Sequence, residues 1–238
     1  MNNSHEKKLT GTIVDVRKLD ASLKDSMLEL MQKFYYADEK SFLNDLANKD
    51  RVILLSDSSQ KIQGFTSAKI FNLDWPEPVK IIFSGDTIIH PDFWGTLELP
   101  RTWGQFMLDT IAESASHRLF WFLISSGFRT YRFLPAYFNE FYPRFDGETP
   151  EEFRKILNAA AIQLFGESFN SETGIIKLSN PTPLKEIIAP PNDERRKNPH
   201  INFFLSKNPG YVDGDELACI TELSLNNIKP FVKRLLRT

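Results

Sequence analysis

Cysteine is almost missing from this 238-residue chain, which holds only Cys219. A disulfide framework within the chain is therefore excluded, which is typical of proteins in a reducing compartment. No apolar run comes near the roughly 18 residues that a membrane span needs. The opening MNNSHEKK also lacks the apolar segment of a secretory signal. We therefore expect a cytoplasmic protein with no membrane span.

An excess of basic residues is missing as well. The net charge is −2, whereas a nucleic-acid-binding domain normally carries a basic surface. The His, Cys and carboxylate residues show no metal-ligand spacing, and the nucleophile motif G-x-S-x-G does not occur. The sequence thus predicts no nucleic-acid partner and no metal site.

Apolar and aromatic residues, by contrast, are plentiful. Hydrophobic residues make up 41% of the chain, and 20 residues are phenylalanine. A chain of this length and composition can bury a sizeable core as one elaborated domain, so disorder is not expected. The phenylalanine rings either fill that core or line an apolar site.

Hydrophobic periodicity predicts a mixed α/β chain of the α+β kind, in which a doubly wound sheet is not expected. The expected strands cover residues 11–16, 51–55, 61–71, 79–90, 119–124, 201–205 and 216–223. The expected helices cover residues 23–34, 42–46, a segment after Pro100, a short segment from Pro135, and residues 150–165 and 226–236.

Residues 81–109 carry a motif at an expected junction between strand and helix. The run Arg101-Thr102-Trp103-Gly104-Gln105-Phe106 matches the Arg and the first Gly of the pattern Gln/Arg-x-x-Gly-x-Gly/Ala, with Phe106 at the last place. Together with the order of elements, this segment resembles the GNAT superfamily of acyl-CoA N-acyltransferases. The resemblance covers roughly residues 11–145, and the loop before the motif is lengthened through 96–100.

The resemblance implies a GNAT-like fold, with a twisted, mostly antiparallel sheet flanked by helices. Strands 79–90 and 119–125 should be neighbours that separate at their carboxyl ends. The chain then divides into a disordered N-terminus (1–10), a GNAT-like acyltransferase core (11–145) and a C-terminal extension packed on the core (146–238).

The co-substrate that the resemblance implies is acyl-CoA, with an acetyl or a longer group. The thioester would lie along the fourth strand, where the candidate contacts are Ile88 and Ile89. The candidate pyrophosphate ligands are Arg101, Thr102, Trp103, Gly104 and Gln105, which we expect to open a helix. A helix N-terminus offers unpaired N–H groups and a positive dipole end to phosphate. The simpler alternative is a surface Arg101 and a packing Gly104, since R-x-x-G is a common pattern.

Asp86 and His90 are the candidate general bases on the fourth strand. Strict alternation would place both on one face, together with Ser84. An amine must lose a proton to attack a thioester, and the resemblance implies a polar group on this strand that accepts it. His90 has the one side chain whose pKa is naturally near neutrality. The alternatives are an Asp86 that caps a bulge or pairs with a cation, and a His90 that is a hydrogen-bonded surface residue.

For the leaving thiolate, the resemblance implies a tyrosine proton donor after the fifth strand. The candidates there are Tyr131, Tyr137 and Tyr142. Tyr131 shares its helix face with apolar residues and Tyr142 lies beside that stripe, so core packing is the default interpretation of both. Tyr137 lies off the stripe and is the first choice for the acid, with Tyr131 as the second.

A basic run and the single cysteine each allow two interpretations. Arg195, Arg196 and Lys197 would suit the ribose phosphate of CoA, although a solvated loop is the simpler interpretation. Cys219 stands in an apolar strand without a nearby Cys or His, which favours a core residue over a nucleophile.

Three functions follow from these patterns. The leading one is an N-acyltransferase in which a small-molecule or peptide amine attacks acyl-CoA directly. The second is a catalytically silent GNAT-fold domain that acts as a binding or sensor module. The third is an acyltransferase whose donor is an acyl-carrier protein with a long chain, which Phe106 and the many phenylalanines favour. A homodimer is compatible with each of them.

Overall fold

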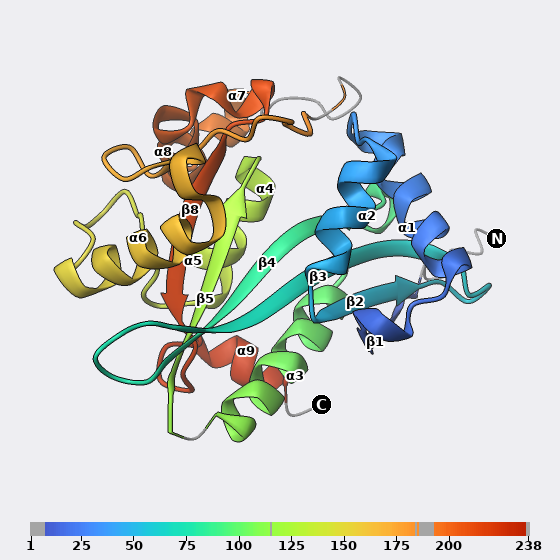
Figure 1. Cartoon of the computed structure of the whole chain (residues 1–238), viewed down its shortest axis with the longest axis horizontal. Coiled ribbons are helices and arrows are strands. Elements are labelled where there is room, and N and C mark those ends of the chain that lie inside the picture. Colours follow the sequence, from blue (N-terminus) through green and yellow to red (C-terminus); the bar gives the residue numbers. More distant parts are fainter. Residues whose placement is uncertain (1–7, 115, 184, 186–192, 237–238) are drawn as a thin grey trace.

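The computed structural model describes residues 8–114, 116–183, 185 and 193–236. Within them, one eight-stranded sheet has the order β1-β2-β3-β4-β5-β8-β7-β6. The strands are β1 (Thr10–Asp15), β2 (Arg51–Ser56), β3 (Ile62–Leu73), β4 (Val79–Ile89), β5 (Arg118–Ser125), β6 (Phe169–Asn170), β7 (Ile175–Ile176) and β8 (Glu216–Glu222). The β4–β5 pair is parallel and the other pairs are antiparallel. The mixed, mostly antiparallel sheet that the sequence predicts is thereby confirmed (Figure 1).

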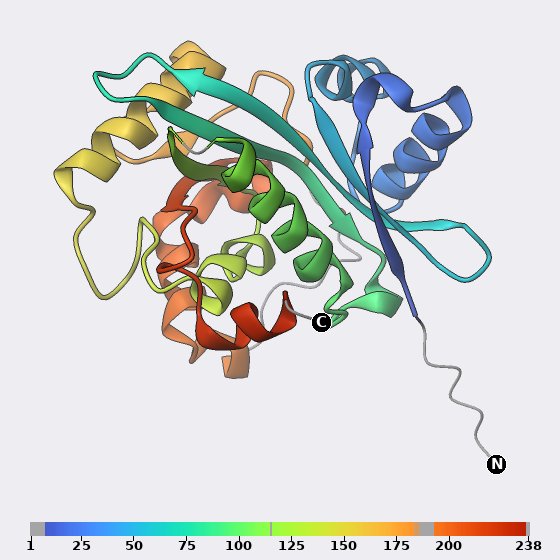
Figure 2. The ribbon, with the colours of Figure 1, turned by 90° about the horizontal axis from the view of Figure 1, so that it is seen from below.

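Helices cover both faces of the sheet (Figure 2). One face carries α1 (Ala21–Phe34), α2 (Glu39–Ala47) and α6 (Glu151–Phe165). The other carries α3 (Glu98–Glu113), α4 (Phe128–Tyr131), α5 (Phe133–Tyr137), α8 (Pro199–Lys207) and α9 (Pro230–Leu235), while the short α7 (Asp193–Arg196) precedes α8. None of the described helices is long and apolar enough to cross a membrane.

The two faces of the sheet are packed differently. On the face of α3, one buried cluster joins the helices to the sheet. On the opposite face the buried side chains form two clusters, one under α1 and α2 and the other under α6. The sheet between these two clusters is therefore left without a continuous apolar cover, and a cavity lies there.

Side-chain caps fix where several helices begin. Asp20 accepts a hydrogen bond from the Leu23 N–H at the start of α1, and Asp38 accepts one from the Ser41 N–H in α2. Each cap satisfies a backbone donor that the helix itself cannot pair. These two helices frame one side of the cavity between the clusters.

Residues 201–205 form part of α8, so the strand predicted there is wrong. The Asn198 side chain accepts from the N–H groups of His200 and Ile201, and Pro199 occupies the first helical position. Ile201 and Phe204 are buried at helical spacing. A short apolar run does not by itself distinguish strand from helix, and here the cap decides. The final helix also begins later than predicted, at Pro230.

Strands β4 and β5 are neighbours, as predicted, and their pairing covers only part of their length. The paired residues run from Val79 and Arg118 to Ser84 and Leu123. Strand β4 continues to Ile89, where its described partner is β3 alone. A gap therefore opens between the carboxyl ends of two strands in the middle of the sheet.

A β-bulge in β4 lies at the start of this gap. Ala68 pairs with Ser84 but Thr66 pairs with Thr87, so one residue of β3 faces two of β4. The extra residue reverses the alternation: Phe83 and Ile88 pack on the α1/α6 face, whereas strict alternation would place them on opposite faces. The prediction that Asp86 shares a face with Ser84 is therefore wrong, and Asp86 instead lies on the side of Phe83.

The C-terminal residues complete the sheet. Strand β8 pairs with β5, and β7 pairs with β8, so residues 146–238 supply strands of the same sheet as residues 11–145. At the other end, Thr10 opens β1 and Leu9 is buried. Residues 1–7 of the predicted disordered segment lie outside the described residues.

Candidate functional site

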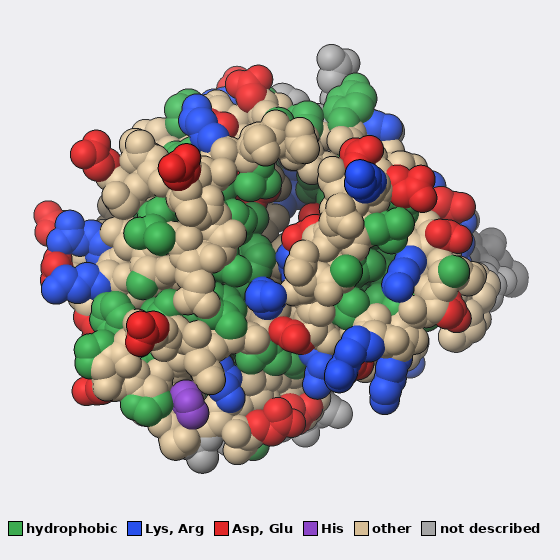
Figure 3. Space-filling view, in the orientation of Figure 1, with side chains coloured by type: hydrophobic (Ala, Val, Ile, Leu, Met, Phe, Trp, Pro, Cys, Tyr) green, Lys and Arg blue, Asp and Glu red, His purple; other side chains and the backbone are tan. Residues whose placement is uncertain are grey.

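Three cavities meet where β4 and β5 separate, and Thr87 and Thr130 line all three. The acidic cavity, of about 220 Å³, lies between the two buried clusters of the α1/α6 face. The cationic cavity, of about 650 Å³, lies beside the loop from β4 to α3 and the segment that follows β5. The apolar chamber, of about 50 Å³, lies between the sheet and α3. Figure 3 shows the surface hollowed between the part that carries α1 and α2 and the part that carries α6.

Two carboxyl groups from different strands line the acidic cavity. Burial, and then the charge of Asp45, raise the pKa of Asp86 to about 6. Burial, and then the charges of Asp86 and Asp45, raise the pKa of Glu216 to about 8. At neutral pH, Asp86 is therefore mainly ionised while Glu216 mainly keeps its proton. Two neighbouring carboxyl groups with separated pKa values are suited to proton transfer.

Lys49 balances part of this negative charge. Its side chain is only 3% exposed, its Nζ lies 2.5 Å from the Asp45 carboxylate, and it lowers the pKa of both Asp86 and Glu216. Gly85, in the bulge, makes room for it, because a Cβ at that position would lie 2.6 Å from the Lys49 Cε. Among the described residues, no group of three or more His, Cys, Asp or Glu side chains is placed to hold a metal ion.

Basic side chains from three segments line the cationic cavity: Arg129, Arg132, Lys185 and Arg195. None of the described residues that line it is an Asp or Glu. The Arg129 guanidinium lies 4.4 Å from the ring centroid of Trp94. Burial and the positive charge of Arg195 lower the pKa of Arg129. An anion beside these two groups would relieve their repulsion, and guanidinium groups bind phosphate well.

The free edge of β4 directs backbone groups into the gap. The His90 N–H donates to the Gln63 carbonyl of β3, and N–H groups alternate in direction along an antiparallel strand. Those of Ile89 and Thr87 therefore point away from β3. The Ile89 carbonyl already accepts a bond of 2.9 Å from the Trp94 indole. A carbonyl group lying in the gap would find backbone donors along this edge.

Tyr35 lies at the passage between the two charged cavities and lines both. Burial raises the pKa of Tyr35 to about 12, although the neighbouring Ser126 side chain acts in the opposite direction. The chain next to it is held by residues of the C-terminal part, since the Tyr36 N–H donates to the Pro183 carbonyl and the Lys185 N–H to that of Phe34. This contact brings Lys185 to the cationic cavity.

The prediction that residues 101–105 open a helix is wrong, because α3 begins at Glu98. The Arg101 N–H already donates to the Leu97 carbonyl, and Pro100 removes one of the first-turn donors. Arg101 instead pairs with Glu98, and Gln105 bonds Asp109. This helix start is therefore poor in the free N–H groups that would hold a phosphate.

The other residues of that motif join α3 to its neighbours. Thr102 packs against Gly11, where a Cβ would lie 1.9 Å from the Thr102 Oγ1. A Cβ on Gly104 would lie 2.3 Å from the Leu236 side chain, so this glycine admits the residues after α9. Trp103 lines the apolar chamber. Gly104 thus matches the packing interpretation that the sequence left open.

Tyr137 is the predicted acid that reaches a cavity. It lines both the cationic cavity and the apolar chamber, stacks on Phe133 with ring centroids 5.8 Å apart, and has a pKa raised by burial. Tyr131 is fully buried, donates to the Pro143 carbonyl, and lines none of the three cavities.

His90, the second candidate base, caps a 3₁₀ helix. Its Nδ1 accepts from the Asp92 N–H at 3.3 Å, and its ring lies edge-on to Phe34. It lines none of the three cavities. Ile89 lines the cationic cavity, and Ile88 reaches it from a buried position in the cluster under α1.

Comparisons with known proteins bear on the fold. No family model matches the sequence, and no curated protein does. A probable N-acyltransferase of Enterococcus faecalis matches with 12% identity and a TM-score of 0.42 over 56% of this chain and 33% of that one. An Escherichia coli GNAT family N-acetyltransferase in complex with CoA matches with 12% identity and a TM-score of 0.38 over 53% and 68%. A GNAT family acetyltransferase of Staphylococcus aureus matches with 15% identity and a TM-score of 0.41 over 60% and 92%.

These likenesses are too distant to inform substrate or mechanism, and the chain spans only about a third of the first of these structures. The topology of the sheet is stronger evidence for the fold than these distant matches are. The sheet is mostly antiparallel, and β4 and β5 are neighbours whose carboxyl ends separate, as the GNAT resemblance implies. The fold is therefore of the GNAT type.

The sequence patterns do not indicate several residues of this site, among them Glu216, Tyr35 and Arg129. Glu216 reaches the acidic cavity because β8 pairs with β5, a long-range contact that no local pattern announces. Tyr35 follows the last turn of α1, where no motif marks it. Arg129 lies in α4, four residues beyond the end of β5, and its proximity to the cationic cavity depends on how the chain turns after that strand.

Proposed function

We propose that this chain is an acyl-CoA-dependent N-acyltransferase. One observation carries the proposal: a cavity lined by cations and a cavity lined by carboxyl groups meet in the gap between β4 and β5. A donor that bears phosphates suits the first cavity, and an acceptor that bears an ammonium group suits the second. The gap would then hold the two reacting groups at close range.

Arginine and lysine side chains would hold the phosphates of the donor. Arg129 and Arg132 follow β5, Lys185 is held beside α1, and Arg195 lies in α7. Guanidinium groups form paired hydrogen bonds with phosphate oxygens. They would replace the helix N–H groups that a glycine loop supplies, because the start of α3 has few of them to offer.

The thioester would lie in the gap, along the free edge of β4. The N–H groups that Thr87 and Ile89 turn away from β3 are suited to polarise its carbonyl. The amine nitrogen attacks the carbonyl carbon from the acidic side, and a tetrahedral intermediate forms. The carbon–sulfur bond then breaks, which leaves an amide and a thiolate and needs no covalent intermediate with the protein.

Proton transfers complete the reaction. The acceptor's ammonium group first loses one proton to water and becomes a neutral amine. Asp86, mainly ionised at neutral pH, would accept the second proton, which the nitrogen loses as the amide forms. Glu216, which mainly holds its proton, would keep the pair from carrying two negative charges before the acceptor arrives. Tyr137 would supply the proton that the leaving thiolate takes, since it borders the gap from the donor side.

Isothermal titration with CoA and acetyl-CoA, followed by turnover with a panel of amines, tests the proposal. Arg129→Ala should weaken CoA binding about tenfold to a hundredfold, the range expected for a lost hydrogen bond to a charged group. The matched control is Arg154→Ala, an exposed arginine that pairs with Glu151 on α6. Binding without turnover of any amine would favour the catalytically silent alternative. A protein that binds neither CoA nor acetyl-CoA would remove the proposal and leave the acyl-carrier protein donor.

A further inference from the structure

The wall of the apolar chamber is almost entirely nonpolar. Its described lining includes no charged side chain. Three of the hydroxyl groups that border it are bonded: Thr66 with Thr87 at 2.7 Å, and Ser84, which accepts from the Trp121 Nε1 at 2.7 Å. The Trp103 Nε1 also lies in the lining and is buried with no hydrogen-bond partner. Such a mainly apolar space favours a hydrocarbon group over a charged one.

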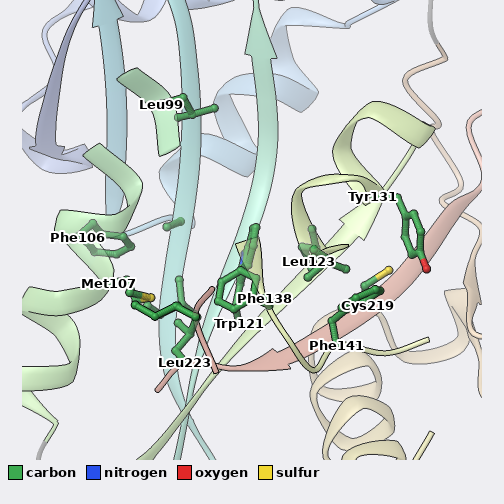
Figure 4. Packing of buried hydrophobic residues seen from close by; sticks show 14 of the residues in the cluster. Leu99, Phe106, Met107, Trp121, Leu123, Tyr131, Phe138, Phe141, Cys219 and Leu223 are labelled. Atoms are coloured by element: carbon green, nitrogen blue, oxygen red, sulfur yellow. The ribbon is translucent and has the colours of Figure 1, made fainter. Parts of the chain in front are cut away.

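The chamber opens at the point where the thioester would lie. It shares Thr87 and Thr130 with both charged cavities, and Pro100, Phe133 and Tyr137 with the cationic cavity. A donor that enters past Arg129 and reaches Thr87 thus has two ways onward, one toward Asp86 and one toward α3. The side chains of Met107 and Trp121, which line the chamber, lie between α3 and the sheet (Figure 4).

Buried residues line the part of the chamber that the two charged cavities do not share. Among them are Met107 of α3, Trp121 of β5 and Val232 of α9. The C-terminal part of the chain supplies Val232, together with Ile228. A chain that extended from the gap into the chamber would therefore pack against α9.

We infer that the apolar chamber binds the acyl chain of the donor, and that this chain is longer than acetyl. The inference rests on the proposed function and specifies its substrate class. The volume of about 50 Å³ is given by the measure in which one water needs roughly 10–15 Å³. It holds roughly three to five carbons beyond the thioester carbonyl, which corresponds to butanoyl to hexanoyl, since a methylene occupies about as much space as a water.

A chain-length series tests the inference directly. Dissociation constants are measured for CoA and for its acetyl, butanoyl, hexanoyl and dodecanoyl thioesters. Each methylene that enters the chamber should tighten binding by about fourfold, which is 0.8 kcal/mol. Affinity should rise from acetyl to hexanoyl and fall for dodecanoyl, which does not fit.

Variants of α9 test whether the gain in affinity from acetyl to hexanoyl depends on the apolar chamber. Val232→Phe should fill the chamber and abolish the gain from acetyl to hexanoyl while leaving the affinity for CoA unchanged. Arg234→Phe adds the same side chain to an exposed position of the same helix and should keep the gain. If Val232→Phe does not fold, Val232→Ala enlarges the chamber instead and should shift the tightest binding to a longer chain.

The outcomes separate the two proposals. Equal affinities for the acetyl and hexanoyl thioesters in a protein that binds CoA would overturn the chamber alone. A gain from acetyl to hexanoyl that survives Val232→Phe, or a preferred chain length that Val232→Ala leaves unchanged, would overturn it as well. A protein that binds none of the series would overturn the proposed function and the chamber with it.

Discussion

Asp86 and Glu216 come from strands far apart in the sequence and share one cavity. The sequence indicates Asp86, because it is the carboxylate of the strand that resembles the donor-binding strand of the family. It does not indicate Glu216, whose place depends on which strand becomes the neighbour of β5. Local patterns thus identify one member of the pair, and tertiary pairing supplies the other.

Asp86→Asn should lower kcat by a hundredfold or more, because the amide cannot accept the proton of the amine. In the unchanged protein, kcat should rise with pH through about 6, as Asp86 loses its own proton. The pH profile of kcat, measured with the amine that the panel identifies, checks both. Asp109→Asn on the outer side of α3 is the matched control. Unchanged turnover in Asp86→Asn would remove Asp86 as the base.

Glu216→Gln should change how stability depends on pH. The Glu216 pKa is about 8 in the folded protein and 4.5 in the unfolded chain, so the folded state binds more protons between these values. The free energy of unfolding of the unchanged protein should therefore fall as pH rises from 5 to 9. Urea unfolding at several pH values should show a smaller fall in Glu216→Gln. Glu172→Gln, at an exposed turn, should retain the full slope.

Tyr137→Phe should lower kcat by a hundredfold or more and change the affinity for CoA little, if Tyr137 protonates the leaving thiolate. Tyr35→Phe is the informative comparison, because Tyr35 also borders the gap. A large loss in Tyr35→Phe with wild-type turnover in Tyr137→Phe would transfer the role to Tyr35.

At the scale of single elements, the bulge in β4 matters most for the site. Alternation along residues 79–90 predicts the faces correctly up to Ser84 and incorrectly beyond it. A bulge adds one residue to a strand, and nothing in the alternation of apolar residues marks where that happens. Gly85 was the available signal, since a glycine inside a strand often accompanies a bulge.

The start of α3 is a second place where the sequence pattern predicts the element but not its exact boundary. The sequence predicts a helix after Pro100 from the helical spacing of Trp103, Phe106 and Met107. The helix begins at Glu98, and Pro100 still lies in the first turn. The observed start lies three residues before Arg101, slightly more than the one or two residues by which helix boundaries ordinarily vary. The shift moves residues 101–105 from a terminus into a regular helix.

Gly104→Ala tests the packing of α3 against the residues after α9. Alanine normally stabilises a helix interior by about 1 kcal/mol relative to glycine. Here the new Cβ would meet the Leu236 side chain, so Gly104→Ala alone should give no gain or a loss. In a Leu236→Ala background the contact is gone, and Gly104→Ala should then stabilise by about 0.5–1 kcal/mol. Urea denaturation of the four proteins of this cycle measures the difference, and equal effects in both backgrounds would contradict the contact.

Across the whole molecule, opposite charges gather on opposite sides of the β4–β5 gap. The net charge of −2 gives no hint of this separation, because composition carries no information on where charges meet. The general architecture, by contrast, follows from the order of elements, since sequence periodicity identifies most strands and helices. The C-terminal part is the exception, because the resemblance does not cover the residues that form its strands.

Raising the salt concentration from 50 to 500 mM should weaken CoA binding by tenfold or more, since exposed charge pairs are screened within about 10 Å at moderate ionic strength. Pantetheine, which carries no phosphate, should bind equally at both concentrations. Titration calorimetry with the two ligands checks this expectation. A CoA affinity that does not respond to salt would speak against Arg129 and its neighbours as phosphate ligands.

The pairing of β8 with β5 also has a consequence during synthesis of the chain. Until Glu216–Glu222 has emerged from the ribosome, the edge of β5 has no partner on that side, and its apolar residues are open to other chains. The N-terminal strands can pair earlier, since domains begin to form from the amino end. The nascent protein therefore has an incomplete sheet whose exposed edge strand can pair with other chains. Strand β8, which covers this edge, also contains Glu216, the second carboxyl group of the acidic cavity.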